Sequence, residues 1–248
     1  MPDNELKPFW SKYVRFDWRF GLFLLALVCI PRFLLVLHAN QTGNYGPIGA
    51  IMLVSALVPF VFLSKAGKRQ IGLKGTGKLG VLALAFAQGI AFSLALYFIG
   101  EALYGDSFQN WYVYIGKSYN IPEGIAPNDK LILFSIMAAT GMLFSPIGEE
   151  LFFRGIVHGS FAQSLGEKKA ALIDALAFSL THIAHFGLVY VSGSWSFYPV
   201  PTLLWVAAMF LVSLVFIRMK KRSGSLLGAI FCHAGFNLGM IYCIFYGI

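Results

Sequence analysis

The chain has 248 residues, of which 58% are hydrophobic and 12% are charged. This composition excludes an ordinary soluble domain of that length. The formal net charge of +8 does not indicate nucleic-acid binding, because the basic residues stand in short clusters between apolar stretches, where they orient a protein in a membrane. We therefore expect an all-α, polytopic transmembrane helical bundle with no nucleic-acid partner.

The first half of the chain predicts an N-terminal arm followed by three spans. Residues 1–19 interleave aromatic and basic side chains, which is typical of an interfacial segment or of a juxtamembrane arm. Spans are expected over about 20–37, interrupted at Pro31 and Arg32, over 47–63 and over 79–104. The linker 65–78 carries basic but no acidic residues. The positive-inside rule places this linker in the cytoplasm together with the arm, and places the loop 105–130 outside.

The second half predicts a further crossing with an ambiguous end, and then three more spans. Residues 131–165 could form one crossing plus a partly inserted helix, or two crossings broken near Pro146. One crossing keeps the basic residues at 168–169 and 218–222 in the cytoplasm, so we favour it. Spans over about 170–186, 201–217 and 226–245 then give about seven crossings, or eight helices. We treat 1–248 as a single multi-pass domain of the cell membrane, with residues 146–248 as its motif-bearing half.

The densest polar cluster inside a predicted span is GEELFFRG at 148–155. Each ionisable side chain in a bilayer costs at least about 2.5 kcal/mol, so such a cluster requires a reason. On a helix, Glu150 and Arg154 share a face, which predicts an ion pair. Glu149 points about 100° away, has no obvious cation nearby in sequence, and is free to act as a general base. Alternatively, both glutamates charge the first turn of a helix that begins after Pro146.

Two later spans carry histidines at helical spacing. His182 follows Phe178 by one turn, and His233 and Asn237 share a helical face beside small residues. An imidazole and an amide can together stabilise an oxyanion, although they also form ordinary contacts between membrane helices. A lone histidine on an apolar helix is more often a hydrogen-bonded packing residue, and we interpret His185 in that way.

Three other ionisable residues lie in or near apolar runs. We expect Asp174, early in its helix and close to two lysines, to be solvated or interfacial. Glu101 is expected near the external surface, and His158 is given no role.

These three elements resemble the signature of one family, the CAAX prenyl endopeptidase and bacteriocin-processing, or Abi-type, membrane peptidases. Its EExxxR, FxxxH and HxxxN motifs all match in order, and the resemblance covers roughly residue 146 to the C-terminus. It implies a helical membrane fold with a polar cavity open toward the cytoplasm and peptide hydrolysis by a glutamate-activated water. The roles it implies are water activation by Glu149 and His182, oxyanion stabilisation by His233 and Asn237, and support of the site by Glu150 and Arg154.

Two alternatives remain open. Glu149, His182 and His233 could hold a catalytic zinc, but the sequence has no HExxH motif, and we favour a mechanism without a metal or other cofactor. The chain could also be a non-enzymatic immunity protein, scaffold or proton-coupled transporter that uses the same charges. The expected partners are membrane lipids and a membrane-associated or lipidated peptide substrate. The sequence does not predict an oligomeric state.

Overall fold

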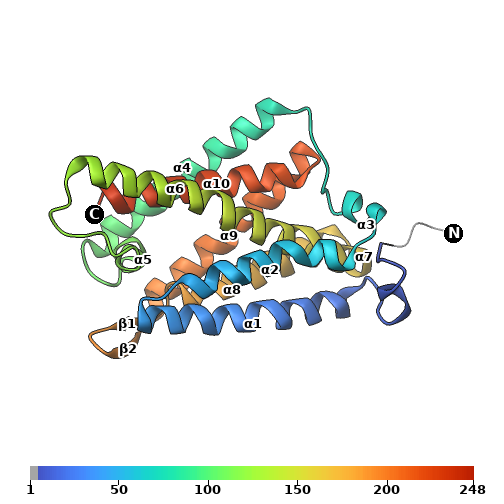
Figure 1. Cartoon of the computed structure of the whole chain (residues 1–248), viewed down its shortest axis with the longest axis horizontal. Coiled ribbons are helices and arrows are strands. Elements are labelled where there is room, and N and C mark those ends of the chain that lie inside the picture. Colours follow the sequence, from blue (N-terminus) through green and yellow to red (C-terminus); the bar gives the residue numbers. More distant parts are fainter. Residues whose placement is uncertain (1–4) are drawn as a thin grey trace.

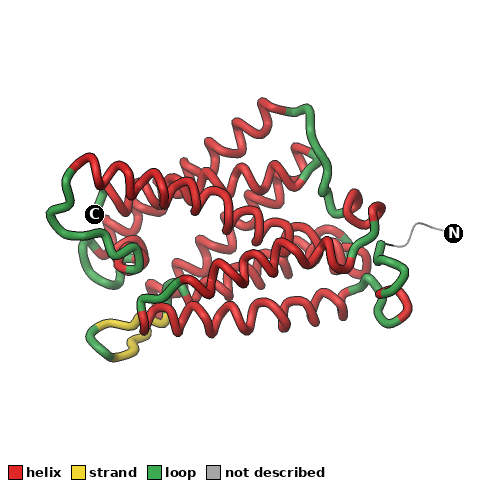
Figure 2. The backbone as a smooth tube through the Cα atoms, in the orientation of Figure 1, coloured by secondary structure: helices red, strands yellow, loops and turns green. Residues whose placement is uncertain are grey.

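The computed structural model describes residues 5–248, and it is built almost entirely from helices (Figures 1 and 2). The long elements are α1 (Trp18–Thr42), α2 (Gly46–Phe62), α4 (Leu79–Tyr104), α6 (Pro127–Glu150), α8 (Glu167–Thr181), α9 (Pro199–Ser223) and α10 (Leu226–Tyr246). Shorter ones are η1 (Trp10–Lys12), α3 (Lys65–Gln70), α5 (Trp111–Lys117), η2 (Leu151–Val157), α7 (His158–Leu165) and η3 (His182–Ala184). Strands β1 (Leu188–Val191) and β2 (Ser194–Phe197) form an antiparallel hairpin.

The lengths of these helices confirm the predicted polytopic bundle. Within residues 5–248, five helices are long and apolar enough to cross a membrane: α1, α4, the 39-residue run from α6 through α7, α9 and α10. The apolar helix α2 is shorter. Helix α8 ends at Thr181, before the end expected at about residue 186, because the chain tightens there into the 3₁₀ turn η3 and then enters the hairpin.

Pro31 does not interrupt its span as we expected, and the break near Pro146, which belonged to the alternative that we did not favour, is absent from the described helix. Pro31 lies inside the continuous helix α1, and Pro146 lies inside α6. Membrane helices tolerate proline because neighbouring groups and small local adjustments satisfy the freed backbone carbonyls. After Pro146 the helix widens into the π-helical segment η2 and continues to Leu165, so the stretch is one continuous helical run of 39 residues.

Charge separates the two ends of the bundle (Figure 1). We call one end the basic end: it holds the N-terminal arm, α3 with the linker to Lys78, the start of α8 and the end of α9. The opposite end, the hairpin end, holds β1–β2, α5 and the start of α6. Its cations are Lys117 and Lys130, which accompany Glu101, Asp106, Glu123 and Asp129. The basic clusters thus gather at one end, as their spacing between spans predicts.

The N-terminal arm is attached to the basic end by specific contacts. Leu6 is 1% exposed and forms an isolated β-bridge with Leu63. The Lys7 amide donates to the carbonyl of Phe62 at 2.9 Å, and the Trp10 indole donates to the carbonyl of Val61 at 2.9 Å. The arm therefore closes the end of α2 and satisfies carbonyl groups that the helix leaves free.

Close packing of α4 against α10 sets the position of the last motif. A Cβ atom on Gly89 would collide with the carbonyl oxygen of Cys232, and one on Gly235 would collide with the carbonyl oxygen of Phe86. Small residues let membrane helices approach at backbone distance. This contact places the His233–Asn237 face of α10 toward the interior of the bundle.

Candidate active site

The two adjacent glutamates stand where α6 widens into the π-helix η2. Glu149 is 2% exposed and Glu150 is fully buried. Single turns of π-helix recur at functional sites, where they change the direction of neighbouring side chains. Here the two carboxylates take different sets of partners, as the helical geometry predicted for Glu149 and Glu150.

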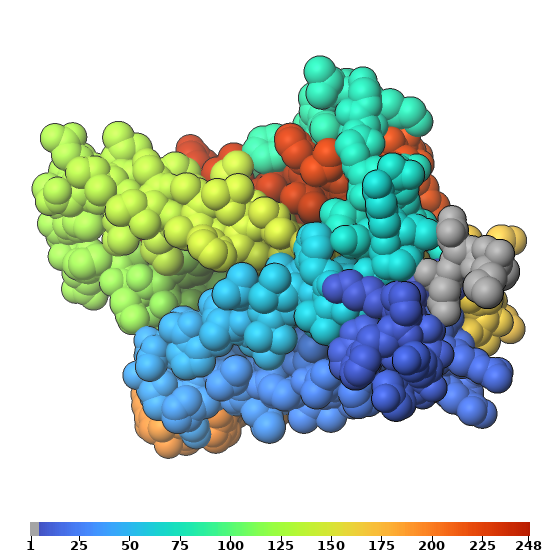
Figure 3. All heavy atoms as spheres, turned by 45° about the vertical axis from the view of Figure 1, so that its right-hand side comes forward, coloured from blue at the N-terminus to red at the C-terminus, as the bar shows by residue number. Residues whose placement is uncertain are grey.

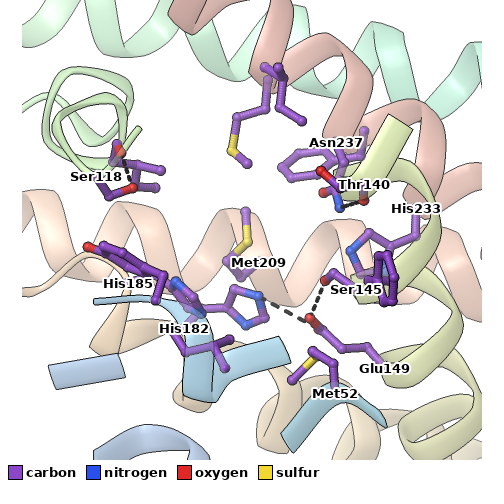
Figure 4. Close-up of a pocket in the computed structure, with 18 of the residues that line it drawn as sticks. Met52, Ser118, Thr140, Ser145, Glu149, His182, His185, Met209, His233 and Asn237 are labelled. Atoms are coloured by element: carbon purple, nitrogen blue, oxygen red, sulfur yellow. Dashed lines mark hydrogen bonds and ion pairs between the residues drawn. The ribbon is translucent and has the colours of Figure 1, made fainter. Parts of the chain in front are cut away.

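Glu149 is held by two donors and faces a histidine, and Figure 4 shows it beside Ser145 and His182. Its Oε1 accepts from the guanidinium of Arg32 at 2.9 Å and from the hydroxyl of Ser145 at 2.5 Å. Its Oε2 lies 4.0 Å from Nε2 of His182. That separation is too long for a direct hydrogen bond and suits a bridging water.

The cation beside Glu149 is the main feature that sequence reasoning missed. The sequence shows no obvious cation next to Glu149, but Arg32 reaches it from α1 and is itself only 4% exposed. The sequence did contain an indication of this contact, because an arginine in the middle of an apolar span needs a partner. The ion pair favours the ionised form of the carboxylate, which is the form that accepts a proton from water.

His182 has a defined tautomer when its ring is neutral. Its Nδ1 lies 2.7 Å from the carbonyl oxygen of Phe178, which can only accept, so Nδ1 carries the hydrogen. The lone pair is then on Nε2, which faces Glu149. The indole of Trp205 donates to the carbonyl of His182 at 3.0 Å and holds the turn η3 in place.

The predicted ion pair between Glu150 and Arg154 is present at 3.2 Å, with both side chains fully buried. A second partner of Glu150 was not predicted: its Oε1 also lies 2.8 Å from Nδ1 of His233. Arg154 donates to the hydroxyl of Ser213 at 2.7 Å, and its Cζ lies 4.1 Å from the ring centroid of Phe178. Phe178 therefore supports the guanidinium as well as the turn at His182.

His233 and Asn237 line one wall of the cavity, but each is bonded to a different group. The His233 ring stacks on Phe216 at 4.8 Å between centroids, and Asn237 donates one amide hydrogen to the carbonyl of Gly141 at 2.9 Å. Because the carboxylate of Glu150 accepts from Nδ1, the His233 ring presents Nε2 as a second donor only when it is protonated. The predicted oxyanion role of the two residues therefore requires a charged imidazole.

A cavity of about 450 Å³ brings Glu149, His182, His233 and Asn237 together. From this site it extends past Met209 to Tyr45 and Ser118 at the hairpin end (Figure 4). Toward the basic end the interior is filled by side chains that are at most 1% exposed, namely Phe152, Phe153, Ile156 and Val157. The cavity therefore opens away from the basic end. From the sequence we expected the basic end to lie in the cytoplasm and the cavity to open toward the cytoplasm. Because the cavity opens away from the basic end, these two expectations cannot both be correct.

Two residues lie in surroundings other than those expected. His185 lines the cavity, with its ring 5.4 Å from that of His182 (Figure 4), rather than serving only as a packing residue. Asp174 is fully buried rather than solvated, and its carboxylate lies 3.3 Å from Nδ1 of His158. The prediction for Asp174 was wrong because its partner, His158, comes from the neighbouring helix α7. Glu101 is exposed at the hairpin end of α4.

The side chains proposed as alternative zinc ligands do not form a ligand set. Nδ1 of His233 is taken by Glu150, and Glu149 is bonded to Arg32 and Ser145. Across residues 5–248, no three His, Cys, Asp or Glu side chains converge as metal ligands do. These residues therefore do not fit a zinc centre, and the metal-independent mechanism stays a prediction.

A polytopic helical bundle with buried glutamate, histidine and arginine side chains around an internal cavity defines an integral membrane protein with a buried polar site. Residues 131–239 match the family model described as Type II CAAX prenyl endopeptidase Rce1-like. The match contains all three motifs and confirms the resemblance to this family over residues 131–239. No curated protein matches the chain significantly, nor does any solved structure.

Proposed function

We propose that the chain is an intramembrane endopeptidase that cleaves a membrane-associated or lipidated peptide without a metal. Glu149 and His182 activate the water, His233 and Asn237 stabilise the oxyanion, and Glu150 and Arg154 support them. The family match supports a membrane peptidase, and the geometry of the buried side chains supports these roles.

Water activation follows from two acceptors that face one position. Oε2 of Glu149 and Nε2 of His182, 4.0 Å apart, can each accept one hydrogen of the same water molecule. The lone pairs of that water then point away from both groups and into the cavity. Arg32 and Ser145 occupy the other carboxylate oxygen, which leaves Oε2 free to take the proton.

The remaining steps balance without another reactant. The water oxygen bonds to the peptide carbonyl carbon and its proton moves to Glu149, which creates a tetrahedral oxyanion. The second donor of protonated His233 and the second amide hydrogen of Asn237 can stabilise that charge. The C–N bond then breaks and the proton passes from Glu149 to the leaving nitrogen, which gives a carboxylic acid and an amine. The acid passes its remaining proton to the amine, so that a carboxylate and an ammonium group are released. Glu150 accepts from Nδ1 of His233, and Arg154 holds Glu150, so the two residues keep the imidazole in place.

The observation that carries the proposal is the separation of roles between the two glutamates. Glu150 is enclosed by Arg154 and His233, whereas Glu149 keeps one oxygen toward His182 and the cavity. Comparing the cellular peptidome with native protein and with Glu149→Ala tests the function. We expect uncleaved precursors to accumulate in the variant. Identical peptidomes would contradict the proposal.

A proteoliposome experiment separates the peptidase from a proton-coupled transporter. Native protein reconstituted into liposomes should cleave membrane peptides without moving protons, as followed by an internal pH dye. Proton movement without cleavage would favour transport, in which intramembrane carboxylates and histidines act as a relay.

A further inference from the structure

The π-helix η2 changes the backbone hydrogen bonds that follow the two glutamates. In an α-helix the amide of His158 would bond to the carbonyl of Arg154, four residues earlier. Here that amide bonds instead to the carbonyls of Phe153 and Gly155. The five-residue spacing of η2 ends at Val157, and the return to α-helical spacing passes over the carbonyl of Arg154. A buried carbonyl is costly without a donor, so another group is needed to bond to it.

Lys220, near the end of α9, supplies the donor for this carbonyl. Its ammonium Nζ donates to the carbonyl of Arg154 at 2.5 Å. Its aliphatic stem packs against the linker after α3, where a Cβ atom on Gly72 would lie 3.4 Å from its Cε. Figure 3 turns the basic end forward and shows α3 with this linker, in blue-green, on the outside of the molecule. Lys220 is therefore half-buried and bonds inward, toward the residues of the site.

Carboxylates surround the ammonium group of Lys220 and stabilise its charge. Those of Asp174, Glu167 and Glu150 lie close enough to attract it. Asp174 is fully buried, and both of its carboxylate oxygens lack a hydrogen-bond donor among residues 5–248. The adjacent Lys221 differs, because its side chain is 50% exposed and pairs at 3.2 Å with the exposed Glu167. Of these two lysines, Lys220 is therefore the one whose charge acts inside the bundle.

Two side chains of α9 hold Arg154 at its two polar ends. Ser213 accepts from its guanidinium at 2.7 Å, and Lys220 donates to its carbonyl. Ser213 and Lys220 are seven residues apart, about two helical turns, so they lie on the same face of α9. The guanidinium pairs with Glu150 at 3.2 Å, and Glu150 lies 2.8 Å from Nδ1 of His233. A shift of the Arg154 backbone would therefore be transmitted to the imidazole that is proposed to stabilise the oxyanion.

We propose, on the basis of the peptidase function above, that Lys220 is a positioning residue for the reaction. Its bond to the carbonyl that η2 passes over fixes the register of the π-helix. That register keeps Arg154, Glu150 and His233 in line with one another. Lys220 is not among the described residues that line the catalytic cavity, so it acts on the rate of the chemical step and not on substrate binding.

Cleavage of one membrane peptide in liposomes, measured as kcat and KM, tests this role. Lys220→Met removes the donor and keeps most of the aliphatic stem. We expect kcat to fall about 10- to 100-fold, as for a catalytic group displaced by about 1 Å, while KM stays at the native value. Lys220→Arg keeps a cationic donor and should retain most of the native kcat. Lys221→Met removes an exposed lysine and should change neither constant.

A double variant separates positioning from stability. Lys220→Met leaves the buried carboxylate of Asp174 without its compensating charge, whereas Lys220→Met combined with Asp174→Asn removes both charges. We expect the double variant to recover most of the Tm that the single variant loses. Its kcat should stay low, because the carbonyl of Arg154 still lacks the ammonium donor.

The two hypotheses fail in different ways. If native protein cleaves no membrane peptide, the peptidase function is wrong and this proposal fails with it. If native protein cleaves and the folded double variant cleaves at the native rate, only the role of Lys220 is wrong. A rise in KM at unchanged kcat in Lys220→Met, or a kcat of Lys220→Arg as low as that of Lys220→Met, would also overturn that role.

Discussion

Replacing Arg32 with methionine removes the counter-ion of Glu149 while filling much of the same space. The two side chains are 4% and 3% exposed, and their paired atoms lie 2.9 Å apart. Breaking a buried ion pair by removing one partner costs about 3–5 kcal/mol, because the remaining charge is uncompensated. We expect Arg32→Met to lower the free energy of unfolding by that amount, which for a chain of this size lowers Tm by roughly 6–20 °C.

The assay is thermal unfolding of purified protein in one detergent, followed by circular dichroism. Native protein is compared with Arg32→Met, Glu149→Gln and the double variant. The double variant replaces the pair with two neutral side chains, so we expect it to recover most of the lost stability while staying inactive. The free energy of unfolding of Arg32→Met could instead lie within about 1 kcal/mol of the native value, as expected for an exposed pair. That result would refute the buried ion pair.

Three further outcomes are expected from the contacts described. Glu150→Gln leaves Arg154 and His233 without their shared carboxylate, so the free energy of unfolding should fall by about 3–5 kcal/mol and cleavage should be lost, as unfolding and peptidase assays would show. Gly89→Val forces α4 away from α10 and should cost about 1–3 kcal/mol in unfolding, whereas Gly80→Val, with nothing within 4 Å, should change stability much less. Prolonged chelation should leave the peptidase rate unchanged; a loss restored by zinc alone would contradict the metal-independent mechanism.

Features set by neighbouring residues could be predicted from the sequence. The long apolar runs predicted the crossings because a span needs about 20 apolar residues. The ion pair between Glu150 and Arg154 was predictable because its members lie one helical turn apart. The different role of Glu149 followed from the same geometry, since adjacent residues on a helix point about 100° apart.

Contacts between distant helices could not be predicted in the same way. Arg32 and Glu149 are 117 residues apart, and Glu150 and His233 are 83 residues apart. The cost of burying a charge indicates that each of these side chains needs a partner, but no spacing rule says which helix supplies it. The short length of α8 was missed for a related reason, because hydropathy does not reveal the tertiary contacts at which an apolar helix ends.

The direction in which the cavity opens also depended on tertiary structure. Charge predicted which loops share a side, and the structure groups them at one end as expected. The family resemblance implied a cavity open to that side, whereas the packed aromatic side chains of Phe152 and Phe153 close it there. The end at which the cavity opens is therefore decided by side-chain packing, which the motifs do not encode.

The central role of Glu149 is tested most directly by single-turnover cleavage of one membrane peptide in identical liposomes. Native protein is compared with His182→Gln and with the Arg32→Met, Glu149→Gln double variant, whose folding is checked by thermal unfolding. Loss of general-base action alone accounts for about 10²–10⁴-fold. We predict a decrease of at least that size in both variants, with the fold intact. Cleavage by the double variant at the native rate would contradict the account.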